Sequence, residues 1–298
     1  MGESASAQGA GALPNLLVIG AMKCGTSSLH RYLDLHPQVA MSAWKEPNFF
    51  LDEAAWGNWE RGLDWYRAQF DAAAPVRGEA SVNYTNLPQS EPVAERIERV
   101  LGRPRLIFMV RDPIERAISH YIHAYSAGRE ERSAEAALAD LESRYVRRSL
   151  FATQLRPFVE RFGAGSIHVE TQDALLERRG ETMRRVFAFL DVDPDFTSPE
   201  FERLWEVSAG KDARFTLAYR LSRRLGGSER WARLPTGARW AAERLTHRRS
   251  AGPAQRPAIS PELRRRLEEL YRPELEELEA MAGVELPGVG PRVPPSSR

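Results

Sequence analysis

Cysteine is almost absent from this chain of 298 residues, since Cys24 is the only one. A disulfide within the chain is therefore excluded. A domain of this length does not need one, because it buries about 75% of the surface of its unfolded chain. Reduced thiols are typical of reducing compartments, so we expect a cytoplasmic location.

Long apolar runs are absent as well. No stretch approaches the roughly 20 apolar residues of a membrane span, and the start, MGESASAQGAGALP, lacks the basic and apolar regions of a secretory signal. The net charge of +1 provides no overall field for binding nucleic acid. The six histidines have no metal-ligand spacing. We therefore expect no membrane span, no nucleic acid and no metal.

Lysine is scarce. The 42 basic residues include three lysines, Lys23, Lys45 and Lys211, which leaves 39 arginines. The two side chains are not interchangeable, because lysine carries a compact charge and arginine a planar fork. Two of the three lysines lie in the motifs described below. Either a compact ammonium is needed there or the placement is chance.

Apolar segments of strand length alternate with amphipathic segments of helix length. The sequence predicts strands at 15–20, 105–110 and 166–170, and helices at 26–35, 91–101, 113–125, 149–162 and 181–190. Such alternation is typical of βαβ units. We predict a three-layer α/β fold with a mainly parallel central sheet and helices on both faces. The pattern does not give the strand order.

The composition predicts a single domain, residues 14–282, between disordered tails at 1–13 and 283–298. Within that domain the stretch 207–260 is rich in arginine and glycine, and we interpret it as a mobile lid or as a set of short surface helices. A last helix is predicted at 261–281, and Pro273 is expected to bend or restart it.

The segment VIGAMKCGTSSLHRYL joins the first strand to the first helix. Backbone N–H groups at such a helix start form an anion site, so the fold is expected to be P-loop-like. The spacing differs from a Walker A loop, because the lysine precedes the second glycine. An ordinary strand-to-helix turn is the alternative. The candidate anion ligands are Lys23, Cys24, Gly25, Thr26, Ser27 and Ser28.

A second anchor, RDPIERAISHY, follows the strand at 105–110. Asp112 can cap the next helix and Pro113 suits its first turn. Arg111 and Ser119 offer a guanidinium fork and a hydroxyl to a phosphate dianion. The alternative is a surface arginine that pairs with Asp112 or Glu115.

Together the two motifs resemble those of sulfotransferases that use 3′-phosphoadenosine 5′-phosphosulfate (PAPS). GAMKCGTSSL is similar to the loop that grips the 5′-phosphosulfate, and RDPxxRxxSxY is similar to the segment that binds the 3′-phosphate, through residues matching Arg111 and Ser119. The likeness covers roughly residues 15–190 and is greatest for the heparan sulfate branch and its bacterial relatives. It implies sulfuryl transfer to a hydroxyl, with release of adenosine 3′,5′-bisphosphate and without a metal.

The segment WKEPNFFLD (44–52) extends the resemblance. In the heparan sulfate branch the glutamate matching Glu46 takes the proton of the acceptor hydroxyl, a role that a positioned carboxylate can fill. Lys23 would then stabilise the bridging oxygen of the leaving phosphate. A surface Glu46 paired with Lys45 is the alternative.

Two positions depart from the family pattern. Ala80 stands where the heparan sulfate enzymes carry a lysine at the reaction centre, and Phe151 replaces a tyrosine in RSLF. Ala80 puts the detailed active site and a glycosaminoglycan acceptor in doubt, and Phe151 removes any contact made by the tyrosine hydroxyl. We expect Lys211 and Arg214 to close over the donor.

Two other functions stay open. A nucleotide-dependent kinase would require Mg²⁺, and a non-catalytic nucleotide-binding module would not turn over PAPS. The acceptor is expected to be a small molecule or a saccharide, and a sugar, a lipid and a secondary metabolite all remain candidates. The sequence indicates nothing about oligomeric state.

Overall fold

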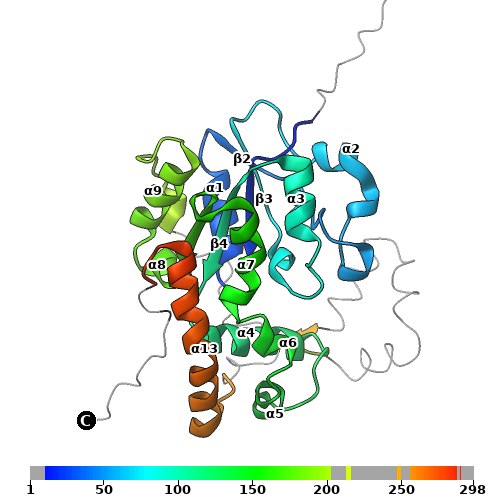
Figure 1. Cartoon of the computed structure of the whole chain (residues 1–298), viewed down its shortest axis with the longest axis vertical. Coiled ribbons are helices and arrows are strands. Elements are labelled where there is room, and N and C mark those ends of the chain that lie inside the picture. Colours follow the sequence, from blue (N-terminus) through cyan, green and yellow to red (C-terminus); the bar gives the residue numbers. More distant parts are fainter. Residues whose placement is uncertain (1–10, 203–212, 216–246, 250–255, 287–288, 290–298) are drawn as a thin grey trace, which may run out of the picture. The chain divides into compact units, whose positions relative to one another are not determined.

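The computed structural model describes residues 11–202, 213–215, 247–249, 256–286 and 289 (Figure 1). Their contacts divide the chain into two compact units. The first draws on Met1–Arg116, Arg148–Glu206 and Arg266–Arg298, and the second on Ala117–Arg147 and Val207–Arg265. Each unit is thus assembled from separate stretches of the chain. A single domain over 14–282 stays a prediction.

A five-stranded parallel sheet forms the centre of the first unit, in the order β2-β3-β1-β4-β5. The strands are β1 (Leu16–Gly20), β2 (Val39–Met41), β3 (Val76–Ala80), β4 (Arg105–Val110) and β5 (Ile167–Thr171). The three strands predicted from the sequence are confirmed as β1, β4 and β5. Because all the strands are parallel, their carboxyl ends meet at one edge of the sheet, where ligands bind in such folds.

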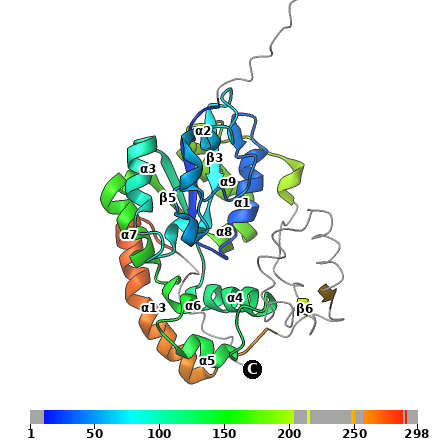
Figure 2. The ribbon, with the colours of Figure 1, turned by 90° about the vertical axis from the view of Figure 1, so that its right-hand side faces the viewer.

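Helices cover both faces of this sheet, as Figures 1 and 2 show from two directions. One face carries α1 (Thr26–Asp34), α8 (Gln172–Glu177) and α9 (Arg179–Leu190), and the other carries α3 (Val93–Leu101) and α7 (Phe151–Phe162). All five residues of β1 are buried, as expected for a strand that is covered on both faces. The predicted three-layer α/β fold is therefore confirmed.

The remaining elements of the first unit are short, apart from the last helix. They are α2 (Gly62–Arg67) and the 3₁₀ turns Glu53–Ala55, Trp59–Arg61, Val82–Thr85, Ala164–Ser166 and Pro199–Glu202. The last helix, α13 (Pro261–Ala282), enters the first unit at Arg266. It contacts α7 through Glu274, which accepts hydrogen bonds from the backbone and the hydroxyl of Thr153 at 3.0 and 2.6 Å.

One sequence prediction needs correction here. Helix α13 is continuous through Pro273, so it does not restart there, and the bend stays a prediction. Part of the predicted tail 283–298 is packed, because Leu286 and Val289 are buried in the core of the first unit. The backbone N–H of Leu286 donates to Glu279 at 2.8 Å, which ties this stretch to the end of α13.

The second unit contains most of α4 (Pro113–Ser126) together with α5 (Ala134–Ala139) and α6 (Arg144–Arg147). Strands β6 (Ala213–Phe215) and β7 (His247–Arg249) pair antiparallel in the same unit. The rest of the predicted lid, 207–260, lies outside the described residues apart from 256–260, and so does most of the tail 1–13.

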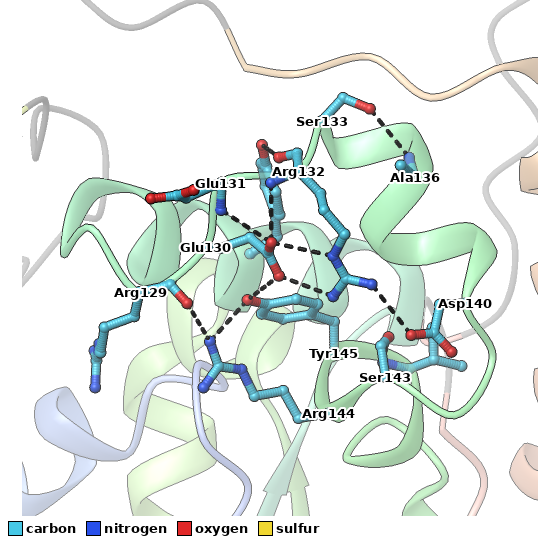
Figure 3. Close-up of polar contacts among 12 residues, drawn as sticks. Arg129, Glu130, Glu131, Arg132, Ser133, Ala136, Asp140, Ser143, Arg144 and Tyr145 are labelled. Carbon is cyan, nitrogen blue, oxygen red and sulfur yellow. Dashed lines mark hydrogen bonds and ion pairs between the residues drawn. The ribbon is translucent and has the colours of Figure 1, made fainter.

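A polar network connects the loop after α4 to α5 and α6 (Figure 3). The Glu130 carboxylate accepts two hydrogen bonds from the Arg132 guanidinium, at 3.1 and 2.9 Å, and one from the Tyr145 hydroxyl at 3.0 Å. Arg132 also donates to Asp140 at 3.2 Å. Ser133 caps α5 through the backbone N–H of Ala136 at 3.2 Å. These bonds hold the loop 127–133 in one conformation.

Candidate functional site

The first motif forms a tight loop between β1 and α1. Lys23 and Gly25 both have left-handed backbones, with φ of 71° and 88°, so the chain turns sharply twice within three residues. No side chain caps α1, and its first turn contains no acidic residue. The first N–H groups of a helix have no partner inside the helix, so this helix start is suited to an anion.

The loop is held by a hydrogen bond to β4 and by the buried side chain of Cys24. The backbone N–H of Ala21 donates to the Met109 carbonyl of β4 at 2.8 Å. The side chain of Cys24 is fully buried, and burial raises the pKa of its thiol to about 12. Cys24 therefore packs under the loop as a neutral thiol, and its side chain is not suited to nucleophilic chemistry.

The second motif meets the first at the carboxyl ends of β1 and β4. The guanidinium of Arg111 donates to the carbonyl of Lys23 at 3.3 Å. Its Nε is buried and has no acceptor among the described residues. Asp112 is buried, and its carboxylate accepts the backbone N–H of Glu115 at 2.8 Å and so caps α4, as predicted. Arg111 thus retains a donor for a bound anion.

The other predicted donor ligands are placed as follows. Thr26 is buried and Ser27 and Ser28 are half-buried at the start of α1. Ser119 belongs to the second unit, where it is buried on α4. Lys211 lies outside the described residues, and Arg214 is described only as the backbone partner of Arg248 in β6 and β7.

Glu46 lies in the loop after β2 and is half-buried. Its backbone is left-handed, with φ of 57°, and so is that of Asn48, with φ of 48°. The neighbouring residues are clamped: the Asn48 N–H donates to the Ser81 hydroxyl at 2.9 Å, and the Asn58 amide donates to the Pro47 carbonyl at 2.7 Å. Left-handed backbones at non-glycine residues persist only where the surroundings hold them, and they cluster at functional sites.

Lys45 connects the Glu46 loop to the phosphate loop. Its ammonium donates to the hydroxyl of Ser27 at 2.5 Å. The alternative interpretation of the sequence paired Lys45 with Glu46, whereas the ammonium bonds to the helix that follows the phosphate loop. The residue next to the candidate base is therefore in direct contact with the candidate anion site.

A buried carboxyl that the sequence analysis missed supports the Glu46 loop. Glu79, at the end of β3, is fully buried and accepts hydrogen bonds from the hydroxyls of Tyr66, Tyr84 (2.9 Å) and Ser81 (2.5 Å). Burial raises its pKa above the ordinary value. Ser81 in turn accepts a hydrogen bond from the backbone N–H of Asn48, so Glu79 is connected to the Glu46 loop through Ser81. The signal in the sequence was the row of polar residues in GEASVNY, in which the neighbouring Ala80 is also buried.

Arg116 is the second missed residue. It is fully buried, and its Nε donates to Ser149, whose hydroxyl donates to the Pro113 carbonyl, at 2.6 and 2.9 Å. Burial lowers the pKa of Arg116 to about 10, so its guanidinium is charged at neutral pH.

Phe151, which stands in place of the family tyrosine, is buried with its ring 6.0 Å from that of Phe108.

A parallel α/β sheet whose first strand ends in an anion loop, joined to an arginine from the next strand, defines a protein that binds phosphate or sulfate groups. The comparisons narrow this class. Residues 63–197 match the model described as "Sulfotransferase family". A crystal structure of a sulfotransferase from Alicyclobacillus acidocaldarius is 26% identical, with a TM-score of 0.64 over 92% of this chain and 98% of that one. The chain is therefore similar to sulfotransferases, both in its fold and over the residues matched.

Curated proteins show the same similarity. The membrane-associated sulfotransferase kil1 of Dictyostelium discoideum is 38% identical over 114 residues, which are 37% of this chain and 22% of the relative. The mouse heparan sulfate glucosamine 3-O-sulfotransferase 5 is 28% identical over 61% of this chain and 54% of its own length. The chain thus spans about half or less of the length of these relatives.

Among the described residues, no helix is long and apolar enough to cross a membrane. Within the same part of the chain, no group of three or more histidine, cysteine or acidic residues is placed to hold a metal ion.

Proposed function

We propose that this chain transfers a sulfuryl group from PAPS to an acceptor hydroxyl and releases adenosine 3′,5′-bisphosphate. The observation that carries the proposal is the hydrogen bond from Arg111 to the Lys23 carbonyl, which joins the two nucleotide motifs at the carboxyl edge of the sheet. The names of the relatives, which include heparan sulfate sulfotransferases, support the reaction class.

The donor fits the residues present. A phosphosulfate suits the uncapped start of α1, with Lys23 and the hydroxyls of Ser27 and Ser28 around it. The 3′-phosphate suits the buried Nε of Arg111, which needs an acceptor. We assign Ser119 to the same phosphate by resemblance. Lys211 and Arg214 remain predicted donor contacts.

The chemistry then divides between two residues. Glu46 takes the proton of the acceptor hydroxyl as the new bond from oxygen to sulfur forms. Lys23 stabilises the negative charge that develops on the bridging oxygen as its bond to sulfur breaks. Like phosphoryl transfer, this reaction depends mainly on positioning and charge stabilisation. The hydrogen bonds that hold the two loops, from Arg111 to Lys23 and from Asn48 to Ser81, support this positioning.

The test is the Glu46→Gln variant, which keeps the size of the side chain and removes the base. Turnover of PAPS with an accepted hydroxyl compound should fall by ~10²–10⁴-fold, the usual contribution of a general base. Affinity for adenosine 3′,5′-bisphosphate and the melting temperature should stay close to those of the wild type. Glu53→Gln is the matched control, because Glu53 is an exposed glutamate on the same loop.

The results that contradict the proposal are distinct. Near-normal turnover in Glu46→Gln would assign the base to another residue. Joint loss of donor binding and stability would make Glu46 a structural residue. Failure of the wild type to bind adenosine 3′,5′-bisphosphate, or to release it from PAPS with any acceptor, would reject sulfuryl transfer itself.

A further inference from the structure

Tryptophan is concentrated beside the candidate base. Four of the seven tryptophans lie between positions 44 and 65. Trp44 and Trp65 meet edge to face, with ring centroids 5.7 Å apart, and the Arg61 guanidinium lies 5.4 Å from the Trp44 ring and 4.9 Å from the Trp65 ring. We call these three residues the tryptophan–arginine cluster. All three belong to the first unit.

This cluster is more exposed to solvent than aromatic side chains usually are. Trp44 is 49% exposed, although a tryptophan ring gains most from being covered. Arg61 is exposed, and its contacts in the described part of the chain are with the two indole rings rather than with a carboxylate. An apolar ring surface and an uncompensated cation are therefore presented together.

The chain itself connects this cluster to the reacting groups. Trp44 precedes Glu46 by two residues, and Lys45 between them donates to Ser27 at the start of α1. The backbone N–H of Ala43 donates to the Gln69 carbonyl at 3.0 Å, and the Ser42 hydroxyl donates to the Trp44 carbonyl at 2.9 Å. The segment 42–45 is thus held by its backbone and by Lys45, Trp44 contacts Trp65 of α2, and Glu46 follows directly in the chain.

We propose that the tryptophan–arginine cluster binds the acceptor, and that this acceptor is an aromatic acid whose hydroxyl is delivered to Glu46. The inference rests on the proposed sulfuryl transfer and names its substrate class. The exposed part of the Trp44 indole offers a flat ring a partner, because aromatic rings prefer stacked and edge-to-face contacts. The guanidinium pairs with the acid while it remains stacked on the indoles.

The test compares three compounds, 4-hydroxyphenylacetate, its neutral amide and D-glucuronate, by turnover with PAPS and by calorimetry on protein saturated with adenosine 3′,5′-bisphosphate. The aromatic acid should bind most tightly. Trp44→Ala should weaken its binding about 10-fold, the upper range for a lost aromatic pair, and Trp44→Phe should restore most of it. Arg61→Gln should weaken binding of the acid about 10-fold and leave binding of the amide unchanged.

Trp56→Ala is the matched control, because Trp56 is 67% exposed and lies outside the cluster. Binding of adenosine 3′,5′-bisphosphate should be the same in every variant, which shows that the fold is intact. Equal losses in Trp44→Ala and Trp56→Ala, or equal losses for acid and amide in Arg61→Gln, would overturn the proposal. Preferred binding of D-glucuronate would assign the cluster to an acidic sugar instead. All of these results leave sulfuryl transfer standing, since it depends on donor binding and turnover.

Discussion

Glu130 makes the stability of the second unit depend on pH. Hydrogen bonds from Arg132, followed by those from Tyr145 and the backbone, lower the pKa of this carboxyl from 4.5 to about 2 (Figure 3). Because the folded-state pKa is depressed, the ionised carboxylate stabilises the second unit above the ordinary pKa. This stabilisation is lost as the pH falls from about 4.5 towards 2.

The magnitude follows from that shift. Taken in full, it corresponds to about 3 kcal/mol. The side chain of Glu130 is 9% exposed but that of Arg132 is 45% exposed, so solvent screening reduces the contribution to about 1–2 kcal/mol. Glu130→Gln should remove this amount at pH 7, because a neutral amide does not pair with the guanidinium.

The assay is hydrogen exchange of the α5 and α6 amides between pH 7 and pH 3, because these helices belong to the network. With intrinsic exchange rates corrected for pH, the difference between Glu130→Gln and the wild type should shrink as the pH falls below about 4.5. Glu131→Gln, an exposed neighbour, is the control and should match the wild type. A difference that is constant with pH would refute the electrostatic argument, and equal losses in the two variants would refute its assignment to Glu130.

Three further predictions concern the donor site. Lys23→Ala should abolish detectable sulfuryl transfer, and Lys23→Arg should also be severely impaired because a fork does not replace a point charge; wild-type rates in Lys23→Arg would make the loop merely structural. Arg111→Ala should weaken binding of adenosine 3′,5′-bisphosphate by ~2–3 kcal/mol and barely affect adenosine 5′-phosphosulfate, which calorimetry can measure; equal losses would remove Arg111 from the 3′-phosphate. Turnover should persist in excess chelator, whereas complete loss restored by Mg²⁺ would favour a kinase.

The strands that the sequence predicted have five or six residues and a recognisable pattern. β1 and β4 are dominated by apolar side chains, as expected for central parallel strands, whereas the edge strand β5 (IHVET) alternates apolar and polar residues. β2 has three residues, too few for any periodicity, and β3 reads VRGEA, with two charges and a glycine. Strand pairing rather than local pattern stabilises these two, so they could not be predicted from their own residues.

The same distinction holds for the site. Lys23 and Arg111 were found because each follows a strand within a recognisable motif, and the structure joins them. Glu79 was missed because its importance depends on Tyr66, 13 positions earlier, and on the link from Ser81 to Asn48, 33 positions away. Such contacts exist only once the sheet is assembled. From the sequence alone, a glutamate at a buried strand position looks like a violation of the apolar pattern of the core, because its hydrogen-bond partners are not visible there.

Lys23 and Glu46, the two residues assigned to the chemistry, share one structural feature. Both have left-handed backbones, which cost an L-residue about 1–2 kcal/mol. The strain is maintained by bonds that do not touch the reaction: Ala21 to Met109 and Arg111 to Lys23 on one loop, and Asn48 to Ser81 on the other. Since sulfuryl transfer depends on positioning, these supporting bonds fix where the ammonium and the carboxylate stand. A substitution of Ser81, which is fully buried, should therefore lower the catalytic rate by displacing Glu46.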